Sequence, residues 1–548
     1  MNVPRSQRLI APILAVLLAV LLAVLSGGCL RPDRWGVFQK PSEPPVPAED
    51  TRPIEEAEPF HPRLAEEPAF ALPAEGPASL SVEQAILLVF SNNRDLQVRQ
   101  MNPVIAGTFE KIERGTFDPE LFAEFSYGKE RTKETAASTG TEFDVEGNET
   151  AAIAGIRQTL PSGTTFEATV EQERTVSDRT PELQTARLGL SVTQSLLRGF
   201  GPSVNLVNVR QAELGAVASV YELRGFTEAV LASTEIAYWN YVLARLAIEI
   251  VEKSLAVARQ QKNEVELRIE VGILPEIEAA AARAQVASQV QALIEARSLL
   301  EENRLRLLQL ISPGPHGRLD LQVDATSEPN IEPEPITDLG DRLQLAEQSR
   351  PDLNEARLRL AQNRLQTIAT RNGILPRLDL FIALGQTGFA DTFSDSFREL
   401  DGNTYDFRAG IRLSHFLGNR AADAKDLAAR ASRRQAADAV DNLLQMVQVD
   451  VRIAFNEVER ARQQIFASRA TRTLREETLN AEKERFDVGV STSLLVAQAQ
   501  RDLLASSIEE VKAIINYRTA LVRLYLAEGS LLDRRGVSLP AGGTGDRL

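Results

Sequence analysis

An ordered set of short matches occurs twice in this chain, and it constrains the fold more than any other feature of the sequence. The tetrapeptide NRDL at residues 93–96 corresponds to RPDL at residues 350–353. Later matches keep the same order, and the last of them pairs Arg268, Val271 and Gly272 with Arg485, Val488 and Gly489. Because the order is unchanged, we interpret the chain as two copies of one structural unit.

The duplication sets the expected domain boundaries, with a helix–strand–helix repeat at residues 80–332 and a second at residues 333–532. The spacing of matching positions falls from 257 residues between Pro119 and Pro376 to 221 residues between Gly189 and Gly410. The first repeat therefore contains about 36 additional residues, the size of an added strand pair. The sequence leaves open whether this pair, near residues 150–175, would enter a barrel.

Alternation of apolar and polar residues predicts strands in both repeats. In residues 405–413 every second side chain is apolar, with charged residues or glycine between them. The same pattern occurs at 378–384, at 187–193 and, within the additional stretch, at 166–171. Such strands have one apolar face and one wet face. They fit either a sheet on a soluble core or a transmembrane barrel, with lipid outside and water in the lumen.

Long helices follow the strands in each repeat. No proline occurs from about Val204 to Arg268, and apolar residues recur at every seventh position: Val209, Ala216, Leu223, Val230, Ala237, Ala244, Val251, Ala258 and Val265. This spacing is typical of a coiled-coil seam, and such a helix would extend about 100 Å. A second helix, expected at about 275–310, runs back after a turn at Gly272. The second repeat has its counterpart around Gly489.

The first 29 residues have the pattern of a targeting segment, with Arg5 and Arg8 before an apolar run at 9–25. A membrane-spanning anchor is one interpretation, because the run is nearly long enough to cross a bilayer. Small residues then precede Cys29, the only cysteine of the chain. They resemble a bacterial lipoprotein cleavage site, which implies that Cys29 receives diacylglycerol and becomes the mature N-terminus. Ser26 stands where such sites usually have leucine.

The segments outside the repeats have no pattern of a folded core. Residues 30–79 are rich in proline with charged residues between, so we expect an extended linker. Residues 533–548 are expected to be a disordered tail.

Composition and spacing argue against several kinds of chemistry. The net charge of −15 disfavours nucleic acid as a partner, because binding it needs clustered lysine and arginine. The three histidines have no metal-ligand spacing, and no glycine-rich phosphate-binding loop is present. We therefore expect a protein that is not an enzyme and that needs no cofactor or metal.

Several segments resemble the TolC family of outer-membrane efflux proteins, and the resemblance covers about residues 80–529. The longest is RFDVGVSTSLL at residues 485–495, and residues 92–96 and 194–199 are similar to two further family segments. The resemblance implies a mainly α fold with β: a duplicated coiled-coil tunnel of long helices plus membrane strands, whose barrel closes only in a homotrimer. Strand number agrees, since four to six strands fall short of the roughly eight that close a small barrel.

The resemblance also implies a function and a location. The chain would be the channel, or exit duct, of a tripartite efflux or type I secretion system. It would lie in the outer membrane with a periplasmic helical extension, and it would contact a periplasmic adaptor and an inner-membrane pump. Neither the cargo nor the pump is indicated. A lipid-anchored coiled-coil adaptor or envelope scaffold is the alternative, although such a protein has no use for the strands.

Two sets of site residues follow from the resemblance. The turns at the ends of the long helices would contact the adaptor, through Arg268, Val271, Gly272, Ile273, Arg485, Val488, Gly489 and Val490. A gate at the tunnel entrance would be formed by Glu278, Ser491, Leu495 and Gln498. Some family members have aspartates at the positions of Leu495 and Gln498, and an arginine at that of Ser491. We therefore expect an entrance that restricts passage by bulk and poor wetting, not by a negative field.

Acylation of Cys29 is directly testable. Metabolic labelling with a fatty acid should label the wild-type protein and leave Cys29→Ser unlabelled. Cys29→Ser should alter processing more than final location, because a barrel would also hold the protein in the membrane. An unlabelled wild-type protein would refute the lipid anchor.

Overall fold

The computed structural model describes residues 77–135, 137–311, 319–329, 331–401 and 404–537. The targeting segment, Cys29 and most of the predicted linker lie outside these residues. The first described strand, β1 (Ala78–Leu80), pairs in parallel with β6 (Val323–Ala325). The linker prediction is thus wrong at its last two residues, because Ala78 and Ser79 belong to β1 and Ala78 is fully buried.

The described elements occur twice in the same order, as the sequence matches predict. The first repeat consists of α2 (Val82–Asn92), α3 (Arg94–Arg114), four strands, α5 (Val207–Glu270) and α6 (Glu278–Ile311). The second consists of α7 (Leu339–Ser349), α8 (Pro351–Gly373), two strands, α10 (Arg420–Asp487) and α11 (Ser493–Glu528). Short helices α4 (Pro202–Asn205), α9 (Phe393–Arg398) and α12 (Leu531–Arg534) complete the set, together with two 3₁₀ turns.

All long strands form one antiparallel sheet in the order β2-β3-β4-β5-β7-β8. The strands are β2 (Glu120–Thr135), β3 (Glu142–Thr159), β4 (Thr164–Ser177), β5 (Leu183–Ser195), β7 (Arg377–Ala390) and β8 (Tyr405–Ser414). In the second repeat β7 follows the helix directly and β8 leads into the next, as β2 and β5 do in the first. The additional pair is therefore β3–β4. It joins the common sheet of the single chain.

The β3–β4 connection depends on Gly163. Its φ of +84° lies in the left-handed region, where a side chain would be strained. A Cβ at this position would also collide with the carbonyl oxygen of Gly199, at the start of the long-helix segment. Two bonds fix the turn: Gly163 N–H donates to Leu160 O at 2.9 Å, and Ser195 N–H donates to Gly163 O at 3.1 Å.

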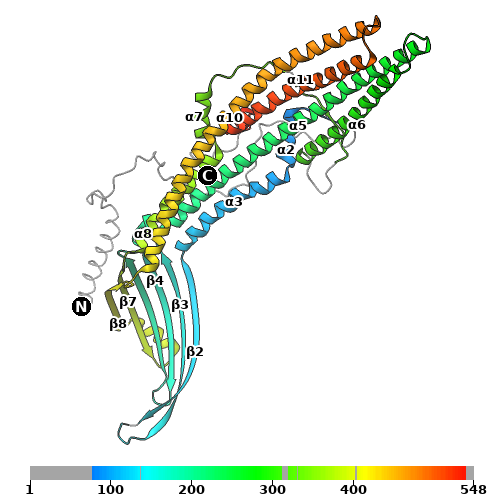
Figure 1. Ribbon diagram of the computed structural model, residues 1–548. Helices are drawn as coiled ribbons and strands as arrows, with labels where there is room; N and C mark the ends of the chain where they lie inside the picture. The colour runs from blue at the N-terminus through cyan, green and yellow to red at the C-terminus, as the bar shows by residue number, and fades with distance from the viewer. Residues whose placement is uncertain (1–76, 136, 312–318, 330, 402–403, 538–548) are drawn as a thin grey trace. The chain divides into compact units, whose positions relative to one another are not determined.

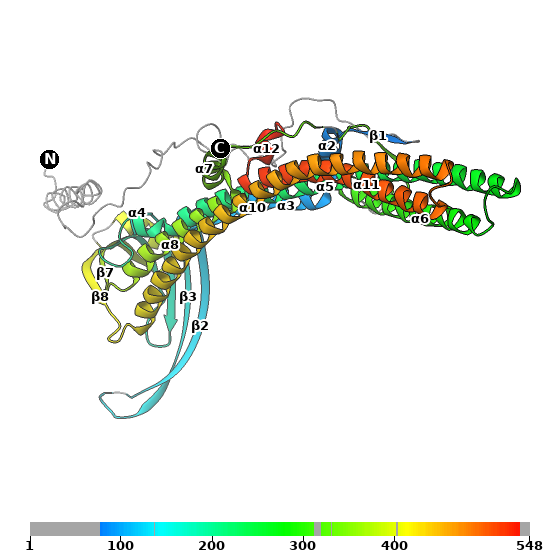
Figure 2. The same ribbon diagram turned by 45° about the horizontal axis from the view of Figure 1, so that its top comes forward.

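The helices next to the sheet form a layer with the order α3-α5-α8-α10, since α3 packs on α5, α5 on α8 and α8 on α10. The sheet lies at one end of these helices, and the turns that close the α5–α6 and α10–α11 hairpins lie at the other (Figures 1 and 2). Helix α3 leads into edge strand β2, and edge strand β8 leads into α10. Both layers therefore end at the same two sides.

The heptad seam is confirmed in α5. Six of its nine positions are buried, namely Val209, Leu223, Ala244, Val251, Ala258 and Val265, and the other three are half-buried. Near the turns the seam packs in a core that α5, α6, α10 and α11 share, around Val265, Phe486 and Val496. No helix among the described residues is long and apolar enough to cross a membrane.

The predicted disordered tail is ordered at its start. Helix α12 and the residues up to 537 pack on the helical layer, with Leu531, Leu532 and Val537 buried. The Arg535 guanidinium donates to both carboxylate oxygens of Glu235, with a distance of 2.7 Å from Nε to Oε1. The fully buried Glu235 carboxylate needs a cation, and Arg535 supplies it from a position that composition alone assigns to a tail.

One buried acid on α5 is only partly compensated. The Glu228 side chain is 1 % exposed and accepts a hydrogen bond from Arg224 Nε at 3.4 Å. Arg224 also donates to Asp533 Oδ2 at 3.0 Å, so its charge is shared. Burial raises the pKa of Glu228 to about 7, although Arg224 opposes the shift.

This pKa gives the stability a pH dependence with a defined sign. The folded chain holds the Glu228 proton up to about pH 7. The stabilising contribution of protonated Glu228 to the free energy of unfolding is therefore fully present below pH 4.5, and it is lost as the pH rises through 7. Glu228→Gln should remove this slope and raise the free energy of unfolding at pH 8 by about 1–3 kcal/mol. Thermal unfolding in detergent from pH 5 to 8 measures it, with exposed Glu222→Gln as the matched control. An unchanged slope in Glu228→Gln would contradict the assignment.

Candidate functional site

The two long hairpins end in turns of the same construction. Gly272 has φ +77° and Gly489 has φ +78°, which glycine adopts without a steric penalty. In the first turn Gly272 N–H donates to Ile269 O and Ile273 N–H to Arg268 O, at 2.9 and 2.8 Å. The second turn repeats both bonds at the matching positions, with 3.0 and 2.8 Å. The duplication therefore extends to the backbone hydrogen bonds of the turns.

The two turns also contact each other. Arg268 Nη2 lies 2.6 Å from Asp487 Oδ1, and the guanidinium lies 5.2 Å from the centre of the buried Phe486 ring. Arg485, at the matching position of the second turn, instead pairs with Glu482 on its own helix at 2.9 Å. The side chains at the ends of both turns are exposed: Val271 62 %, Ile273 71 %, Val488 74 % and Val490 78 %. These four exposed apolar side chains belong to the predicted tip residues, and we call them the tip surface.

The four predicted gate residues separate into two kinds. Leu495 and Gln498 are exposed on α11, three residues apart and hence on one side of the helix. Glu278 is not free. Its Oε2 accepts a hydrogen bond from Ser493 N at 2.9 Å and another from the Ser493 hydroxyl, at the start of α11. Ser491 does not meet Glu278, because its hydroxyl donates to Glu482 Oε2 at 2.7 Å.

Ser493 is a site residue that the sequence prediction missed. Its N–H is one of the donors that a helix N-terminus leaves without a partner inside the helix, and a carboxylate is favoured there. The Thr492-Ser493 pair is a signal for a helix start, but the sequence alone does not show which acid caps it. Glu278 comes from the other repeat, 215 residues away. It joins the first turns of α6 and α11.

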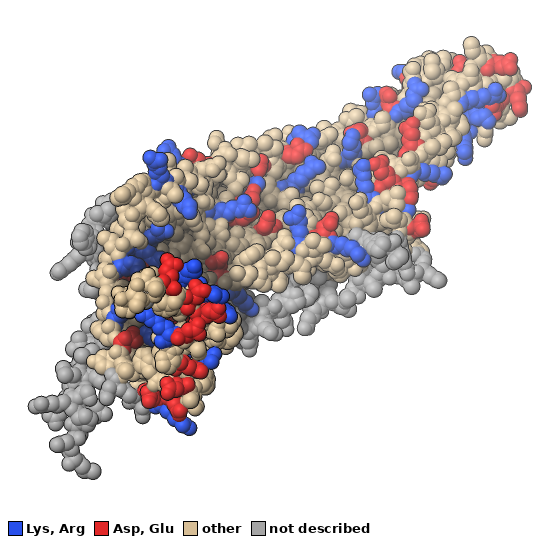
Figure 3. Space-filling model, turned by 90° about the horizontal axis from the view of Figure 1, so that it is seen from below, with Lys and Arg blue, Asp and Glu red and all other residues tan. Residues whose placement is uncertain are grey.

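The sheet has an apolar face and a charged face, which the ladder registers define. The apolar face carries Leu121, Phe125, Ile156, Val170, Leu188, Leu190, Leu384, Phe407, Ile411 and Leu413. The charged face carries Glu120, Glu124, Arg157, Glu167, Glu171, Glu173, Arg187, Asp379, Asp406, Arg408 and Arg412. Basic and acidic side chains are intermixed over the sheet end and along the helices in Figure 3. This distribution fits a water-facing surface and disfavours nucleic acid.

One ion pair on the charged face joins β5 to β8 across the intervening strand β7. Arg187 on β5 donates to Asp406 on β8, with 2.9 Å from Nη2 to Oδ2, and lies 3.4 Å from Glu171 on β4. Gly385 on β7 leaves the room for this contact, because a Cβ there would overlap both the guanidinium and the carboxylate. The sequence prediction missed this pair, and a glycine in the middle of a strand is the signal that could have found it.

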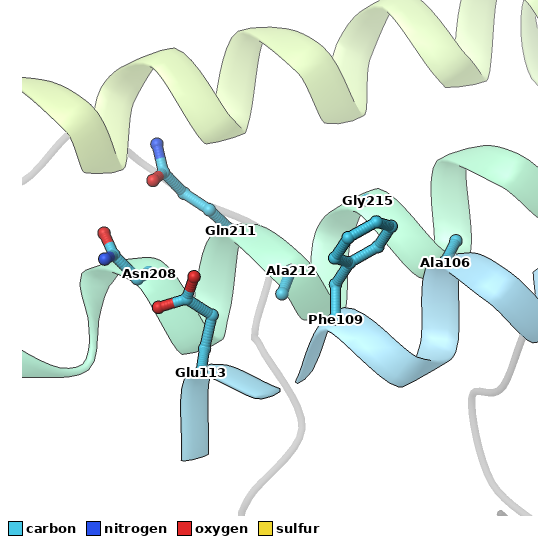
Figure 4. A pocket seen from close by; sticks show the side chains of 7 residues that line it. All are labelled: Ala106, Phe109, Glu113, Asn208, Gln211, Ala212 and Gly215. Carbon is cyan, nitrogen blue, oxygen red and sulfur yellow. The ribbon is translucent and has the colours of Figure 1, made fainter. Parts of the chain in front are cut away.

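A shallow hollow of about 440 Å³ lies between α3 and α5. Its lining has one acid, Glu113, beside Asn208, and the Phe109 ring stands between the two helices (Figure 4). Gln211 points to α8, where its Nε2 donates to Gln362 O at 2.9 Å. No group of three or more metal-ligating side chains occurs among the described residues. The hollow offers no nucleophile beside a base, so it has no arrangement for catalysis.

Comparison with known proteins assigns this architecture. Residues 342–530 match the family model described as outer membrane efflux protein. This part of the chain is therefore similar to the outer membrane efflux proteins. The match lies within the second repeat, and the curated and structural relatives extend the likeness to most of the chain.

Three relatives illustrate the likeness. The outer membrane efflux protein BepC of Brucella suis biovar 1 (strain 1330) is 24 % identical over 65 % of this chain and 75 % of BepC. The CmeC outer membrane channel of Campylobacter jejuni has a TM-score of 0.61 at 17 % identity, over 88 % of this chain and 94 % of CmeC. The open state of the MtrE outer membrane channel of Neisseria gonorrhoeae has a TM-score of 0.56 at 19 % identity, over 89 % of this chain and 98 % of MtrE.

These findings confirm the fold class and the broad function that the sequence predicted. The protein is mainly α with β strands, and its sheet is open in the single chain. It is an outer-membrane exit duct of the kind used in tripartite efflux systems, its helices extend into the periplasm, and it is not an enzyme.

Proposed function

We propose that three copies of this protein form one duct, which a periplasmic adaptor and an inner-membrane pump supply with cargo in an efflux or type I secretion system. Acylated Cys29 would add a lipid anchor to the barrel. The observation that carries the proposal is the pair of open sides shared by both layers. One side is α3 with β2, and the other is α10 with β8.

Apolar side chains on both outer helices support association at these sides. Helix α3 exposes Val98, Met101, Ile105, Phe109 and Ile112, which recur at helical spacing along one stripe. Helix α10 exposes Met446, Val449 and Ile453 with the same spacing. An exposed apolar stripe on a helix is typical of an interface. A ring of copies would place the α10 stripe of one copy against the α3 stripe of the next.

The alternative function, a lipid-anchored coiled-coil adaptor or scaffold, accounts for the helices alone. It gives no role to a sheet whose apolar face has Leu121 at 78 % and Ile411 at 67 % exposure. In a soluble scaffold that apolar face would stay in contact with water, which is unfavourable, and nothing would offset this cost. We therefore retain the duct as the proposed function.

We propose the tip surface as the contact for the adaptor. Its valine and isoleucine side chains are exposed at the end of the helices farthest from the sheet (Figure 1). The Arg268–Asp487 pair and the Phe486 ring beneath it hold the two turns in one arrangement. A partner with apolar helical ends would bury the four side chains.

Charged substitutions at the tip surface should block adaptor contact. Ile273→Asp with Val490→Asp should reduce in vivo cross-linking to the adaptor and efflux by at least about tenfold, because an unpaired carboxylate in an apolar interface is costly. Thermal unfolding should be unchanged, since both side chains are exposed. Leu319→Asp, at an exposed loop position away from the tips, is the matched control. Normal cross-linking and efflux in a stably folded tip variant would rule out the contact.

We propose the predicted gate with one change, which is that Glu278 is bound to Ser493. Three copies would place Leu495 and Gln498 around the entrance, and neither side chain carries a charge. Glu278 was the only acid of the predicted set, and its carboxylate already accepts two hydrogen bonds from Ser493. The entrance then restricts passage by bulk and poor wetting.

Conductance in a planar bilayer tests both the duct and this gate. The purified protein should insert as a conducting unit, and multivalent cations on the periplasmic side should block it only weakly, because tight binding needs clustered carboxylates. Glu278→Gln should respond to the cations as the wild type does. Failure to conduct would contradict the duct. Strong block at low cation concentration would contradict the uncharged gate, and its loss in Glu278→Gln would show that Glu278 faces the entrance.

A further inference from the structure

The two edge strands carry opposite charges on the same face of the sheet. On the charged face β2 has Glu120 and Glu124, and β8 has Arg408 and Arg412. Among the described residues Glu124, Arg408 and Arg412 form no ion pair, Arg412 lies over the Phe381 ring, and Glu120 is 3.9 Å from Arg157. The two edges are therefore complementary in charge, and of these four side chains only Glu120 has an ion-pair partner in its own chain, at the long distance of 3.9 Å.

Chain direction allows the two edges to pair antiparallel. Strand β2 leads away from α3, whereas β8 leads back to α10, so the two strands run in opposite directions at the two sides of one chain. When β8 of one copy meets β2 of a second copy, the pair continues the antiparallel order of the whole sheet. Both edges are unpaired on their outer side, and unpaired backbone groups cannot face lipid.

We propose that β8 of one copy pairs with β2 of a second copy in a single register, with Glu120 opposite Arg412 and Glu124 opposite Arg408. The two acids are four residues apart, and so are the two arginines, so one register satisfies both pairs. The register also sets Phe125 opposite Phe407 and Tyr127 opposite Tyr405 on the apolar face. Aromatic and opposite-charge cross-strand pairs are the ones that stabilise a sheet.

Neighbouring registers lose these pairs. A shift by one residue would turn the apolar side chains of one strand to the wet face. A shift by two residues in one direction sets Glu124 opposite Asp406, which are like charges. The same shift in the other direction sets Glu124 opposite Gly410 and leaves Arg412 opposite Phe122. Of these registers, only the proposed one keeps the apolar side chains of both strands on the same face and also pairs all four charges.

The register has a consequence for the width of the duct. This step rests on the proposed function, in which three copies share one barrel. Each copy contributes a six-stranded sheet, so three copies give a closed barrel of eighteen strands. Barrels of 16–18 strands leave an aqueous channel. The additional pair β3–β4 thus widens the membrane pore of this chain, and each of the three seams lines it with two acid–arginine pairs.

Paired cysteines test the register in the full-length protein in isolated outer membranes. Ala123→Cys is combined in turn with Phe407→Cys, Ala409→Cys or Ile411→Cys. Opposed residues lie about 4.5–5.5 Å apart, whereas a two-residue offset gives about 7–8 Å, beyond the usual reach of a disulfide. Mild oxidation should give a thiol-reversible covalent trimer with Ala409→Cys, at least about fivefold more than with the other two. The four single variants, which retain Cys29, are the controls.

Each result of this experiment decides between parts of the account. Most product with Phe407→Cys or Ile411→Cys would overturn the register and leave the shared barrel intact. No disulfide in any pair, from a protein that light scattering shows to be a trimer in detergent, would overturn the β8–β2 seam alone. No disulfide from a protein that is a monomer would overturn the seam and the proposed trimer together.

Charge exchange provides a second measurement that does not depend on disulfide geometry. Arg408→Glu should lower the temperature at which the trimer dissociates, because it faces Glu124 of the second copy. Adding Glu124→Arg should restore it. Arg398→Glu is the control, a charge reversal at an exposed position whose ion pair is with Asp395 of the same short helix α9, and it should leave the dissociation temperature of the trimer unchanged. Failure of the double variant to regain heat stability would contradict the Glu124–Arg408 pair.

Discussion

The backbone groups along the outer sides of β2 and β8 are the constraint on which the rest of the structure depends. Within the chain each inner strand is paired on both sides, but the two edge strands are paired on one side only. The apolar face of this sheet is exposed in the single chain and fits lipid, where an unpaired N–H or C=O costs several kcal/mol. Six strands are too few to close on themselves around a water-filled lumen. The single chain is therefore an incomplete unit, and in the proposed assembly the missing pairs come from other copies.

The helical layer follows the same rule. Because α3 continues into β2 and β8 continues into α10, the edges of the layer are the edges of the sheet. The exposed apolar stripes on α3 and α10 then lie on the sides where the strands need partners. At the opposite end the hairpins depend less on neighbours, since Arg268 with Asp487 and Glu278 with Ser493 join the two repeats within one chain. The duplicated sequence thus forms a sheet and a helical layer whose edges are open, and hairpin ends that are joined within one chain.

Much of this architecture could be predicted from periodicity. The heptad positions of α5 are buried or half-buried, and the alternating segments are strands, because both patterns report on faces that the local backbone fixes. The site partners could not be predicted in the same way. Arg187 meets Asp406 only because β7 lies between their strands and has glycine at the crossing, and Glu278 meets Ser493 across 215 residues. Arg535 was assigned to a tail for the same reason, since nothing near it in sequence indicates Glu235 as its partner.

The strand count of the barrel tests the central claim most directly. An electron cryomicroscopy map of the full-length protein in detergent or lipid nanodiscs would show it at the level of Phe125. The account requires three chains in one closed barrel of eighteen strands, with β3 and β4 in the wall between β2 and β5. A barrel that excludes the β3–β4 pair, or three separate sheets with free β2 and β8 edges, would contradict it.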